Sequence, residues 1–426
     1  MAAPKKSEMA DSLLAAYPSS IAGGWMTAAR QAATDRFNEM GAPIKRDEYW
    51  KFTDPKALTE LTAKAAVFEN DEAPMFNEID RLKIYFIDGV FDAEMSDDLA
   101  LNGITIEPLA EAAAKDIHWA KDLYGVLEAK GQNPVPRPLA ALNTARAQNG
   151  FVIHVTKSPS KPISFKYSHQ SETSDALVHH VIKLDEGVEA TILESGAGAA
   201  RFNSVMEFDV ADRATLHHVR TQGRDHERKT VTHLFGRLAK ESVFRSFTMT
   251  VNGVLTRNEA VLEFTGDDAK ATVAGASAGD GRNYHHDDTV FVTHDAVNCE
   301  SRQVFKKVLR NGATGVFQGK ILVQPDAQKT DGYQISQGLL LDEDSQFLAK
   351  PELEIYADDV ACSHGSTCGA IDETALYYLR ARGIPLTQAQ NMLVLAFLNE
   401  AVEEVENEEL AEEMRHRLEA WSDRHS

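Results

Sequence analysis

Cysteine is scarce in this sequence of 426 residues, which contains only Cys299, Cys362 and Cys368. An odd number of cysteines, two of them six positions apart, does not form the disulfide framework of a small secreted domain. The sequence also has no run of eighteen apolar residues, and Asp11 precedes only a very short apolar run at 13–17, too short for a signal-peptide core. These absences predict a soluble protein of the reducing cytoplasm.

Positive charge is in deficit, with 44 lysine and arginine residues against 65 aspartate and glutamate residues and a formal net charge of -21. Such a surface repels phosphate backbones and anionic lipid headgroups, so nucleic acid and membrane surfaces are not expected partners. The length exceeds that of one ordinary compact core. It indicates two or three domains or one extended repeat architecture.

Several catalytic and nucleotide-binding motifs are missing. No Gly-x-Ser-x-Gly elbow occurs, and no dinucleotide fingerprint leads from a strand into a helix. Residues 315–321 resemble a phosphate loop, but the spacing is one residue short and no Ser or Thr follows Lys320 to hold magnesium. We therefore expect no nucleotide site in this chain.

Local patterns divide the chain into three regions. Residues 1–145 mix helix-forming segments with one hairpin signal, an Asp-Gly turn inside the β-branched and aromatic stretch 82–91. Residues 146–368 consist of short alternating or β-branched runs without a helical period. Residues 369–426 return to helical patterns. We predict a mainly helical N-terminal region, a β core and a C-terminal helical domain.

A weak repeat runs through the β region. A charged residue followed by Ala-Thr and an aliphatic residue occurs at Glu189, Arg213 and Lys270, and the first two lie 24 positions apart. This spacing falls within the usual period of a coiled β-solenoid. A large β-sandwich fits the same short runs almost as well.

The last region carries signals for three helices. Asp372 can cap a first helix that ends near Gly383, and residues 387–390 form a capping box for a second. A third helix is expected to begin near Asn407. These helices could cap a solenoid or form a docking platform for a partner. The third has an apolar stripe of Leu410, Met414, Leu418 and Trp421.

Two of the three cysteines surround one histidine just before these helices, at Cys362, His364 and Cys368. Thiolate and imidazole can bind a soft metal, relay sulfur or pair across a subunit interface. A closed zinc site needs four ligands, and only Cys299 or a distant histidine could complete this set. If 356–360 forms the last strand and alternation continues, Cys362 and His364 share one face. The alternative is that both merely pack beneath the C-terminal helices.

Histidine doublets in the β region also suggest metal ligands. Neighbours along a strand face opposite sides, so a doublet cannot chelate one ion. We expect most of these histidines to be solvated or to lie satisfied in the core. The doublets are His179-His180, His217-His218 and His285-His286.

Paired carboxylates suggest a second function. A β-solenoid polysaccharide lyase or hydrolase needs paired acids along a groove. Adjacent acids at turns are more often solvated, which is the plainer interpretation. The pairs are Asp267-Asp268, Asp287-Asp288 and Asp358-Asp359.

Longer stretches match a known family. The segments 350–369 and 372–383 resemble the SufD branch of the SufB/SufD family, from the bacterial Suf (SufBCD) machinery that assembles iron–sulfur clusters. Further stretches look like the same family. They are 301–309, 315–321 and 327–334, together with Gly41-Ala-Pro43 and 48–51 near the start.

The resemblance implies a right-handed parallel β-helix between the two helical regions. It also implies a scaffold that is not itself an enzyme, that pairs with its paralogue SufB through the β-helix and that holds one copy of the ATPase SufC on its C-terminal domain. A transient iron–sulfur cluster would form at the interface of the two paralogues. In isolation such a chain is expected to form a homodimer, and whether a flavin binds the whole complex is open.

The family's interface cysteine and histidine fall on Cys362 and His364. The resemblance implies that His364 is an iron ligand facing a cysteine of SufB, since a neutral imidazole binds iron. SufB-like chains have His-Glu where this chain has His364-Gly365, and a cysteine in the segment corresponding to 333–340, which has none here. The sulfur-accepting thiol is therefore expected on the partner. Cys368 is not part of the SufD pattern and is interpreted as a local substitution.

Overall fold

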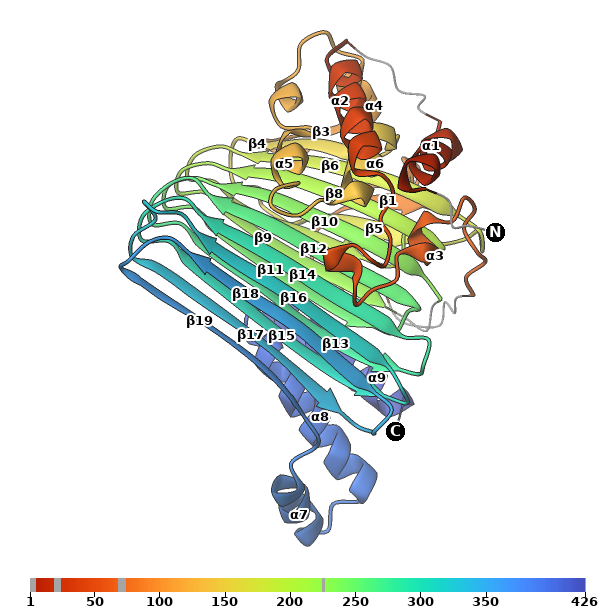
Figure 1. Cartoon of the computed structure of the whole chain (residues 1–426), viewed down its shortest axis with the longest axis vertical. Helices are drawn as coiled ribbons and strands as arrows, with labels where there is room; N and C mark the ends of the chain where they lie inside the picture. The colour runs from red at the N-terminus through yellow and green to blue at the C-terminus, as the bar shows by residue number, and fades with distance from the viewer. Residues whose placement is uncertain (1–4, 19–23, 68–73, 224–226, 426) are drawn as a thin grey trace.

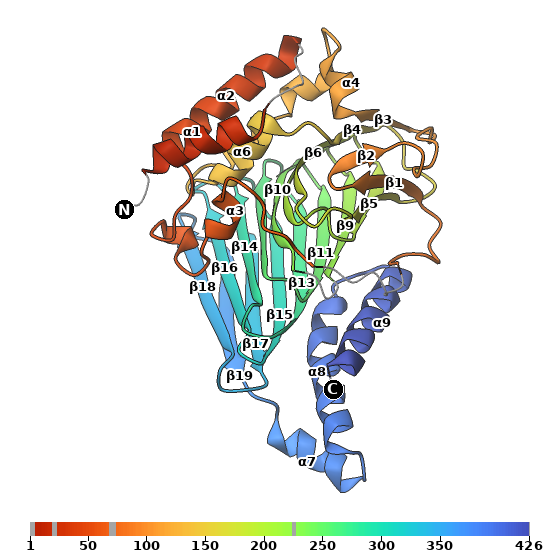
Figure 2. The same cartoon turned by 90° about the vertical axis from the view of Figure 1, so that its right-hand side faces the viewer.

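The computed structural model describes residues 5–18, 24–67, 74–223 and 227–425. Over these residues the chain coils into a β-solenoid with two long sheets that face each other (Figure 1). Helices flank this body on both sides (Figure 2). None of the described helices is both long and apolar enough to cross a membrane.

The strands alternate between the two sheets, because each coil of the chain contributes one strand to each. In the described structure one sheet has ten strands in the order β19-β17-β15-β13-β11-β9-β7-β5-β1-β2, and the other has nine in the order β18-β16-β14-β12-β10-β8-β6-β4-β3. Neighbours from β4 onward are parallel. This confirms the expected parallel β-helix. The strands are β1 (Leu82–Ile87), β2 (Val90–Asp92), β3 (Ile104–Pro108), β4 (Phe151–Val155), β5 (Ile163–Ser168), β6 (Asp175–Leu184), β7 (Glu189–Ser195), β8 (Arg201–Val210), β9 (Thr215–Gly223), β10 (Lys229–Leu238), β11 (Val243–Val251), β12 (Leu255–Phe264), β13 (Lys270–Asp280), β14 (His285–His294), β15 (Glu300–Arg310), β16 (Thr314–Val323), β17 (Thr330–Leu340), β18 (Gln346–Ile355) and β19 (Val360–Gly369).

The repeat found in the sequence is partly out of register with the coils. Glu189 pairs with Thr215, which pairs with Val243, which pairs with Lys270. Glu189 and Lys270 are therefore equivalent positions, whereas Arg213 lies two residues before the equivalent Thr215. The 24-residue spacing is not the coil length, because the turns between strands vary in length. Equivalent positions are set by the hydrogen-bonded pairing of the strands and not by a constant spacing in the sequence.

The predicted hairpin near Asp88 is confirmed. β1 and β2 pair antiparallel across Asp88 and Gly89, which both have positive φ angles as a tight hairpin turn requires. A Cβ atom at Gly89 would lie 2.1 Å from the Cβ of Ala176, so this position also needs glycine for space. β1 in turn pairs in parallel with β5. The N-terminal region therefore adds strands to the solenoid as well as helices.

The helices cover the two sheets on their outer faces. Core residues of α2, α4, α5 and α6 pack on the nine-stranded sheet, for example against Val205 and Phe235. α8 and α9 pack on the ten-stranded sheet, where Leu398 and Met414 join Phe247 and Val304. The helices are α1 (Lys6–Ala16), α2 (Gly24–Met40), α3 (Lys56–Thr59), α4 (Leu109–Ala113), α5 (Val126–Lys130), α6 (Pro138–Arg146), α7 (Glu373–Ala381), α8 (Leu386–Val402) and α9 (Glu408–Arg424), with 3-10 turns at Glu48–Trp50 and Trp119–Asp122.

Two of the three C-terminal helix starts are as predicted. The Asp372 carboxylate accepts from the amides of Thr374 and Ala375, and Asn407 caps α9. The expected capping box at 387–390 is wrong. The N-cap of α8 is Pro385, two residues before Thr387, since proline presets the φ angle there without a side-chain cap. The α9 stripe of Leu410, Met414, Leu418 and Trp421 is buried, as expected.

One end of the solenoid is open. β19 pairs only with β17, and β18 only with β16, within the part of the chain that the structure describes. α7 has no buried residue and stands away from the solenoid below this end (Figures 1 and 2). No further strand of the described chain covers β18 or β19 at this end.

Candidate functional site

The Cys-Ser-His-Gly motif lies within the edge strand β19, at the open end. The sequence placed the last strand at 356–360, but β18 ends at Ile355 and 356–359 form the turn between the sheets. The motif itself is therefore extended. Side chains of alternate residues point to the same side of a strand, so Cys362, His364 and Cys368 share one face.

That face is directed toward the inside of the solenoid. The Cys362 thiol lies 3.1 Å from the place a Cβ of Gly332 would occupy, and Cys362 packs against a small core that contains Ile321 of the opposite sheet. Burial raises the pKa of this thiol. Cys362 is only half-buried, because it lies in the last coil and no further described strand covers that coil.

His364 continues an inward row of polar side chains. It pairs with Gln334 of β17, whose side chain is fully buried and donates to Gln303 of β15 over 2.8 Å. His364 itself is exposed and has no hydrogen-bond or ion-pair partner among the described residues. The imidazole is thus available to a ligand that arrives from outside.

The three cysteines do not gather into one site. Cys299 is fully buried in the turn before β15, where burial raises the pKa of its thiol to about 11. Cys368 is exposed near the far end of β19 from Cys362. Across the described ranges no three His, Cys, Asp or Glu side chains are placed to hold a metal ion. Within the described residues, Cys362 and His364 are therefore not part of a three-ligand cluster.

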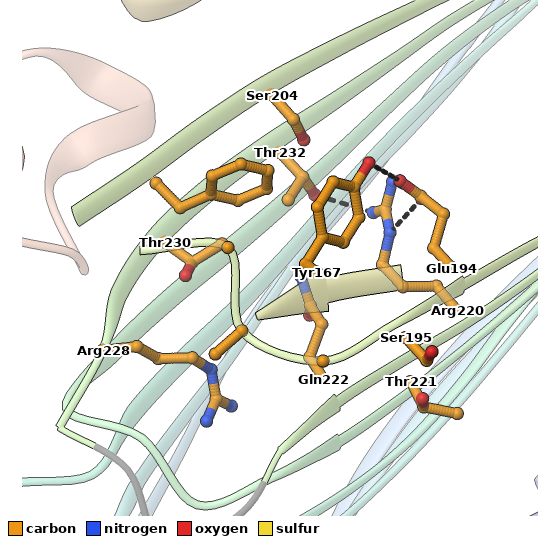
Figure 3. A pocket seen from close by; sticks show the side chains of 14 residues that line it. Tyr167, Glu194, Ser195, Ser204, Arg220, Thr221, Gln222, Arg228, Thr230 and Thr232 are labelled. Atoms are coloured by element: carbon orange, nitrogen blue, oxygen red, sulfur yellow. Dashed lines mark hydrogen bonds and ion pairs between the residues drawn. The ribbon is translucent and has the colours of Figure 1, made fainter. Parts of the chain in front are cut away.

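A hydrogen-bonded network of ionisable groups, not predicted from the sequence, fills part of the lumen (Figure 3). Glu194 accepts from Tyr167 Oη at 3.0 Å and from Arg220 Nε at 2.6 Å. His218 Nε2 lies 2.8 Å from the same carboxylate, and Arg220 reaches Thr232 at 2.8 Å. Burial alone would raise the pKa of Glu194, but Arg220 and His218 hold that pKa well below its ordinary value. A cavity of about 20 Å³ beside these groups has room for a water molecule.

The network continues toward the open end. Thr232 donates to Asn258 at 2.9 Å, and the Asn258 amide lies 3.2 Å from His286 Nε2. Lys307 lies 2.9 Å from His286 Nδ1 and donates to Asp288 at 2.5 Å. Because these groups satisfy one another, we interpret them as structural. In the sequence, the histidine doublets and the Asp287-Asp288 pair supplied members of this network, but no local pattern indicated that they lie together.

The histidine doublets face opposite sides of their strands, as expected. His179 lies outside the sheet, 2.9 Å from Glu207, while His180 lies inside, 3.1 Å from Tyr167. Both rings are fully buried and hydrogen-bonded. His179 and His180 are therefore satisfied core histidines and not a metal site.

The carboxylate pair at Asp287 and Asp288 is not solvated, which corrects the sequence interpretation. Both residues lie in the middle of β14 and are buried. Asp287 points outward to Arg257 at 2.6 Å, and Asp288 points inward to Lys307. Cations of neighbouring strands neutralise the two acids on opposite faces, so they cannot flank one glycosidic bond. This arrangement speaks against the lyase or hydrolase hypothesis.

Buried histidines predict a loss of stability in mild acid. Burial lowers the pKa of His180 and His294 to about 3 and that of His233 to about 4. An unfolded histidine titrates at about 6.5, so below that pH the unfolded chain binds more protons and is favoured. Urea denaturation should show the free energy of unfolding falling by about 1.4 kcal/mol per pH unit for each of these histidines between about pH 6 and 5. In the His294→Gln variant the slope of the unfolding free energy against pH should be smaller by the contribution of one proton. An unchanged slope would show that His294 does not contribute to the loss of stability.

Comparison with known proteins identifies the family. A model described as the SufBD core domain of the SUF system for FeS cluster assembly matches residues 167–397, and one of the SufBD N-terminal region matches 19–163. The iron–sulfur cluster assembly protein SufD of Escherichia coli is 26% identical over 389 residues, covering 89% of each chain. A SufBD family protein of Synechocystis is also 26% identical, over 88% of this chain and 86% of its own. SufD of Bacillus subtilis is 25% identical over 82% of this chain and 80% of its own. With one model spanning more than half of its length, the chain belongs to the SufBD family of iron–sulfur cluster assembly proteins.

Proposed function

We propose that this chain is a SufD-type scaffold subunit, without catalytic activity of its own, on which another chain completes an iron–sulfur cluster site. The observation that carries this proposal is the exposed His364 on an unpaired edge strand of a SufBD-family solenoid. An imidazole that has no partner within the described chain, at a free edge, suits a ligand shared between subunits.

The open end is the proposed surface for a paralogous SufB-type chain. An edge strand presents unpaired N–H and C=O groups that another strand can bond. β19, which contains the motif, offers ten residues of such edge. Pairing there would bring a partner's thiol within reach of His364 and Cys362. The nascent cluster, which is the cargo of the assembly, would be held by these ligands from two chains.

The projecting C-terminal helix is the proposed surface for a SufC-type ATPase. Tyr377 and Tyr378 of α7 are 69% and 57% exposed, and no residue of α7 is buried. Exposed aromatic side chains on one helix are typical of a protein interface. This surface is separate from β19, so one chain can hold both partners at once.

Co-purification with both partners tests the proposal. A tagged chain, co-expressed with a SufB-type chain and a SufC-type ATPase, should retain both, and anaerobic reconstitution of the complex should yield iron and sulfide. Replacing both α7 tyrosines, as Tyr377→Ala with Tyr378→Ala, should weaken ATPase binding on the order of thirtyfold, the usual cost of an aromatic hot spot. The SufB-type chain should still bind.

A matched control removes an exposed apolar side chain elsewhere. Met95 is 51% exposed in the N-terminal region, and Met95→Ala should leave both partners bound. Retention of the ATPase by the double tyrosine variant would move the docking site off α7. Failure of the wild-type chain to retain either partner would refute the scaffold proposal.

A further inference from the structure

Gln334 of β17 carries a buried polar atom that the fold leaves without a partner. Its side chain is fully buried, and its amide nitrogen donates to Gln303 Oε1 over 2.8 Å. Its amide oxygen Oε1 is buried as well but has no hydrogen-bond partner among the described residues. Buried acceptors in folded proteins are nearly always hydrogen-bonded, so this oxygen calls for an explanation.

The Gln334 amide is held in place from two sides. Gln303 bonds it from the preceding coil, and Gly319 of β16 lies against it from the opposite sheet. A Cβ atom at Gly319 would be 2.3 Å from Nε2 and 2.8 Å from Oε1 of Gln334, so a larger residue there would displace the amide. Gly319 belongs to the segment 315–321, which is part of a strand and not a phosphate loop. The Gln334 amide explains why this position has no side chain.

The following coil offers His364 as the partner for this oxygen. β17 pairs in parallel with β19, and Gln334 lies in register with His364. Two residues further along the same pair, Ser336 Oγ and Ser366 Oγ are 2.7 Å apart. In-register side chains on this side of the ladder therefore approach within hydrogen-bond distance. Rotation of the exposed imidazole about its own side-chain bonds can bring a ring N–H to Gln334 Oε1.

We propose that Gln334 is a positioning residue for His364: its amide oxygen accepts a hydrogen bond from one ring nitrogen, so that the other nitrogen presents its lone pair to iron at the open end. A neutral imidazole has one N–H and one lone pair, and the hydrogen bond of the first sets the place of the second. Histidines that bind metals almost always donate their other N–H to an oxygen of this kind.

An amide suits this task better than a carboxylate would. It carries no charge, so it orients the ring without favouring the imidazolium form, which has no lone pair for a metal. The inference rests on the proposed role of His364 as a cluster ligand. It adds to that role a second residue of the same chain, which fixes the direction in which the ligand points.

Binding of Fe²⁺ alone to the cluster-free complex tests the proposal. The full chain is co-purified with the SufB-type chain and the SufC-type ATPase, and anaerobic equilibrium dialysis gives the dissociation constant. Gln334→Met has nearly the size of glutamine but no amide oxygen. It should raise the dissociation constant by on the order of ten- to hundredfold, the usual cost of losing the oxygen that orients a ligand. Gln334→Glu keeps an acceptor oxygen and should recover most of the lost affinity.

A double-mutant cycle separates positioning from a structural role. In the His364→Ala background, Gln334→Met should leave the dissociation constant unchanged, because no imidazole remains to be oriented. A defect of the fold would instead weaken Fe²⁺ binding in both backgrounds. Ser336→Ala is the matched control, since it removes a buried polar group from the same side of the same strand. It should bind Fe²⁺ like the wild type.

Gly319→Ala provides an independent test, because it keeps Gln334 but displaces its amide. This variant should weaken Fe²⁺ binding when His364 is present and have no effect when His364 is replaced by alanine. Normal binding by Gly319→Ala would contradict the proposed place of the amide.

The remaining outcomes distinguish this inference from the function on which it rests. Equal Fe²⁺ binding by the wild type and by His364→Ala would refute the ligand role of His364 and the inference with it. Weaker binding by His364→Ala together with normal binding by Gln334→Met would refute the positioning role alone. A loss in Gln334→Met that persists in the His364→Ala background, or that Gln334→Glu does not recover, would also refute it.

Discussion

The His364→Ala variant is expected to lose cluster formation while its complex still assembles. His364 is exposed and has no partner among the described residues, so its removal costs the fold nothing measurable. If it is a ligand of the nascent cluster, its loss should lower iron and sulfide incorporation by on the order of tenfold or more, since even residues that merely orient metal ligands cost that much. Anaerobic reconstitution of the assembled complex measures this content directly.

The control for this variant lies on the same strand. Ser363 is exposed, and its side chain points to the opposite face from that of His364, so Ser363→Ala should bind the partners and incorporate iron and sulfide normally. Cys362→Ser should have a smaller effect than His364→Ala, because the thiol is half-buried against Ile321. Normal iron and sulfide content in the His364→Ala complex would eliminate this histidine as a ligand.

The Asp287→Ala variant is expected to be less stable than the wild type by about 3 kcal/mol, because it breaks a buried ion pair and leaves polar groups uncompensated. The Asp287 carboxylate accepts from Arg257 at 2.6 Å, from Thr53 at 2.6 Å and from Gln318 at 3.1 Å. These bonds tie Thr53 of the N-terminal region to three successive coils of the solenoid, through β12, β14 and β16. Urea denaturation followed by circular dichroism measures the loss.

Asp358 provides the comparison, since it is an exposed aspartate in the turn before β19. Asp358→Ala should change the free energy of unfolding by no more than about 0.5 kcal/mol. Equal stability of Asp287→Ala and the wild type would show that the buried pair contributes nothing net. A polysaccharide-cleaving activity of the wild type that disappears in Asp287→Asn would revive the lyase or hydrolase hypothesis.

Local signals were sufficient where one short segment determines the structure. The Asp88-Gly89 turn, the Asp372 cap and the buried stripe of α9 needed only neighbouring residues for their prediction. The family motif likewise pointed to the parallel β-helix. Where two nearby residues could each serve as the N-cap of a helix, the prediction was wrong. The sequence favoured Thr387 as the N-cap of α8, whereas the structure has Pro385 there.

Contacts between coils were beyond this kind of prediction. Successive equivalent positions are separated by turns of unequal length, so Arg213 appeared to match Glu189 although the ladder pairs Glu189 with Thr215. Because the pairing of the strands was unknown, the cations that neutralise the buried aspartates could not be predicted either. Asp287 and Asp288 looked like a solvated pair until neighbouring strands placed Arg257 and Lys307 beside them.

The sequence by itself determined the family, the order of the three regions and the residue types of the Cys-Ser-His-Gly motif, because each of these is written in contiguous residues. The tertiary structure alone decided that the motif lies on an unpaired edge. Whether a strand is an edge depends on what every other coil does, and the ladder ends at β19. That placement leaves His364 exposed at the open end of the solenoid.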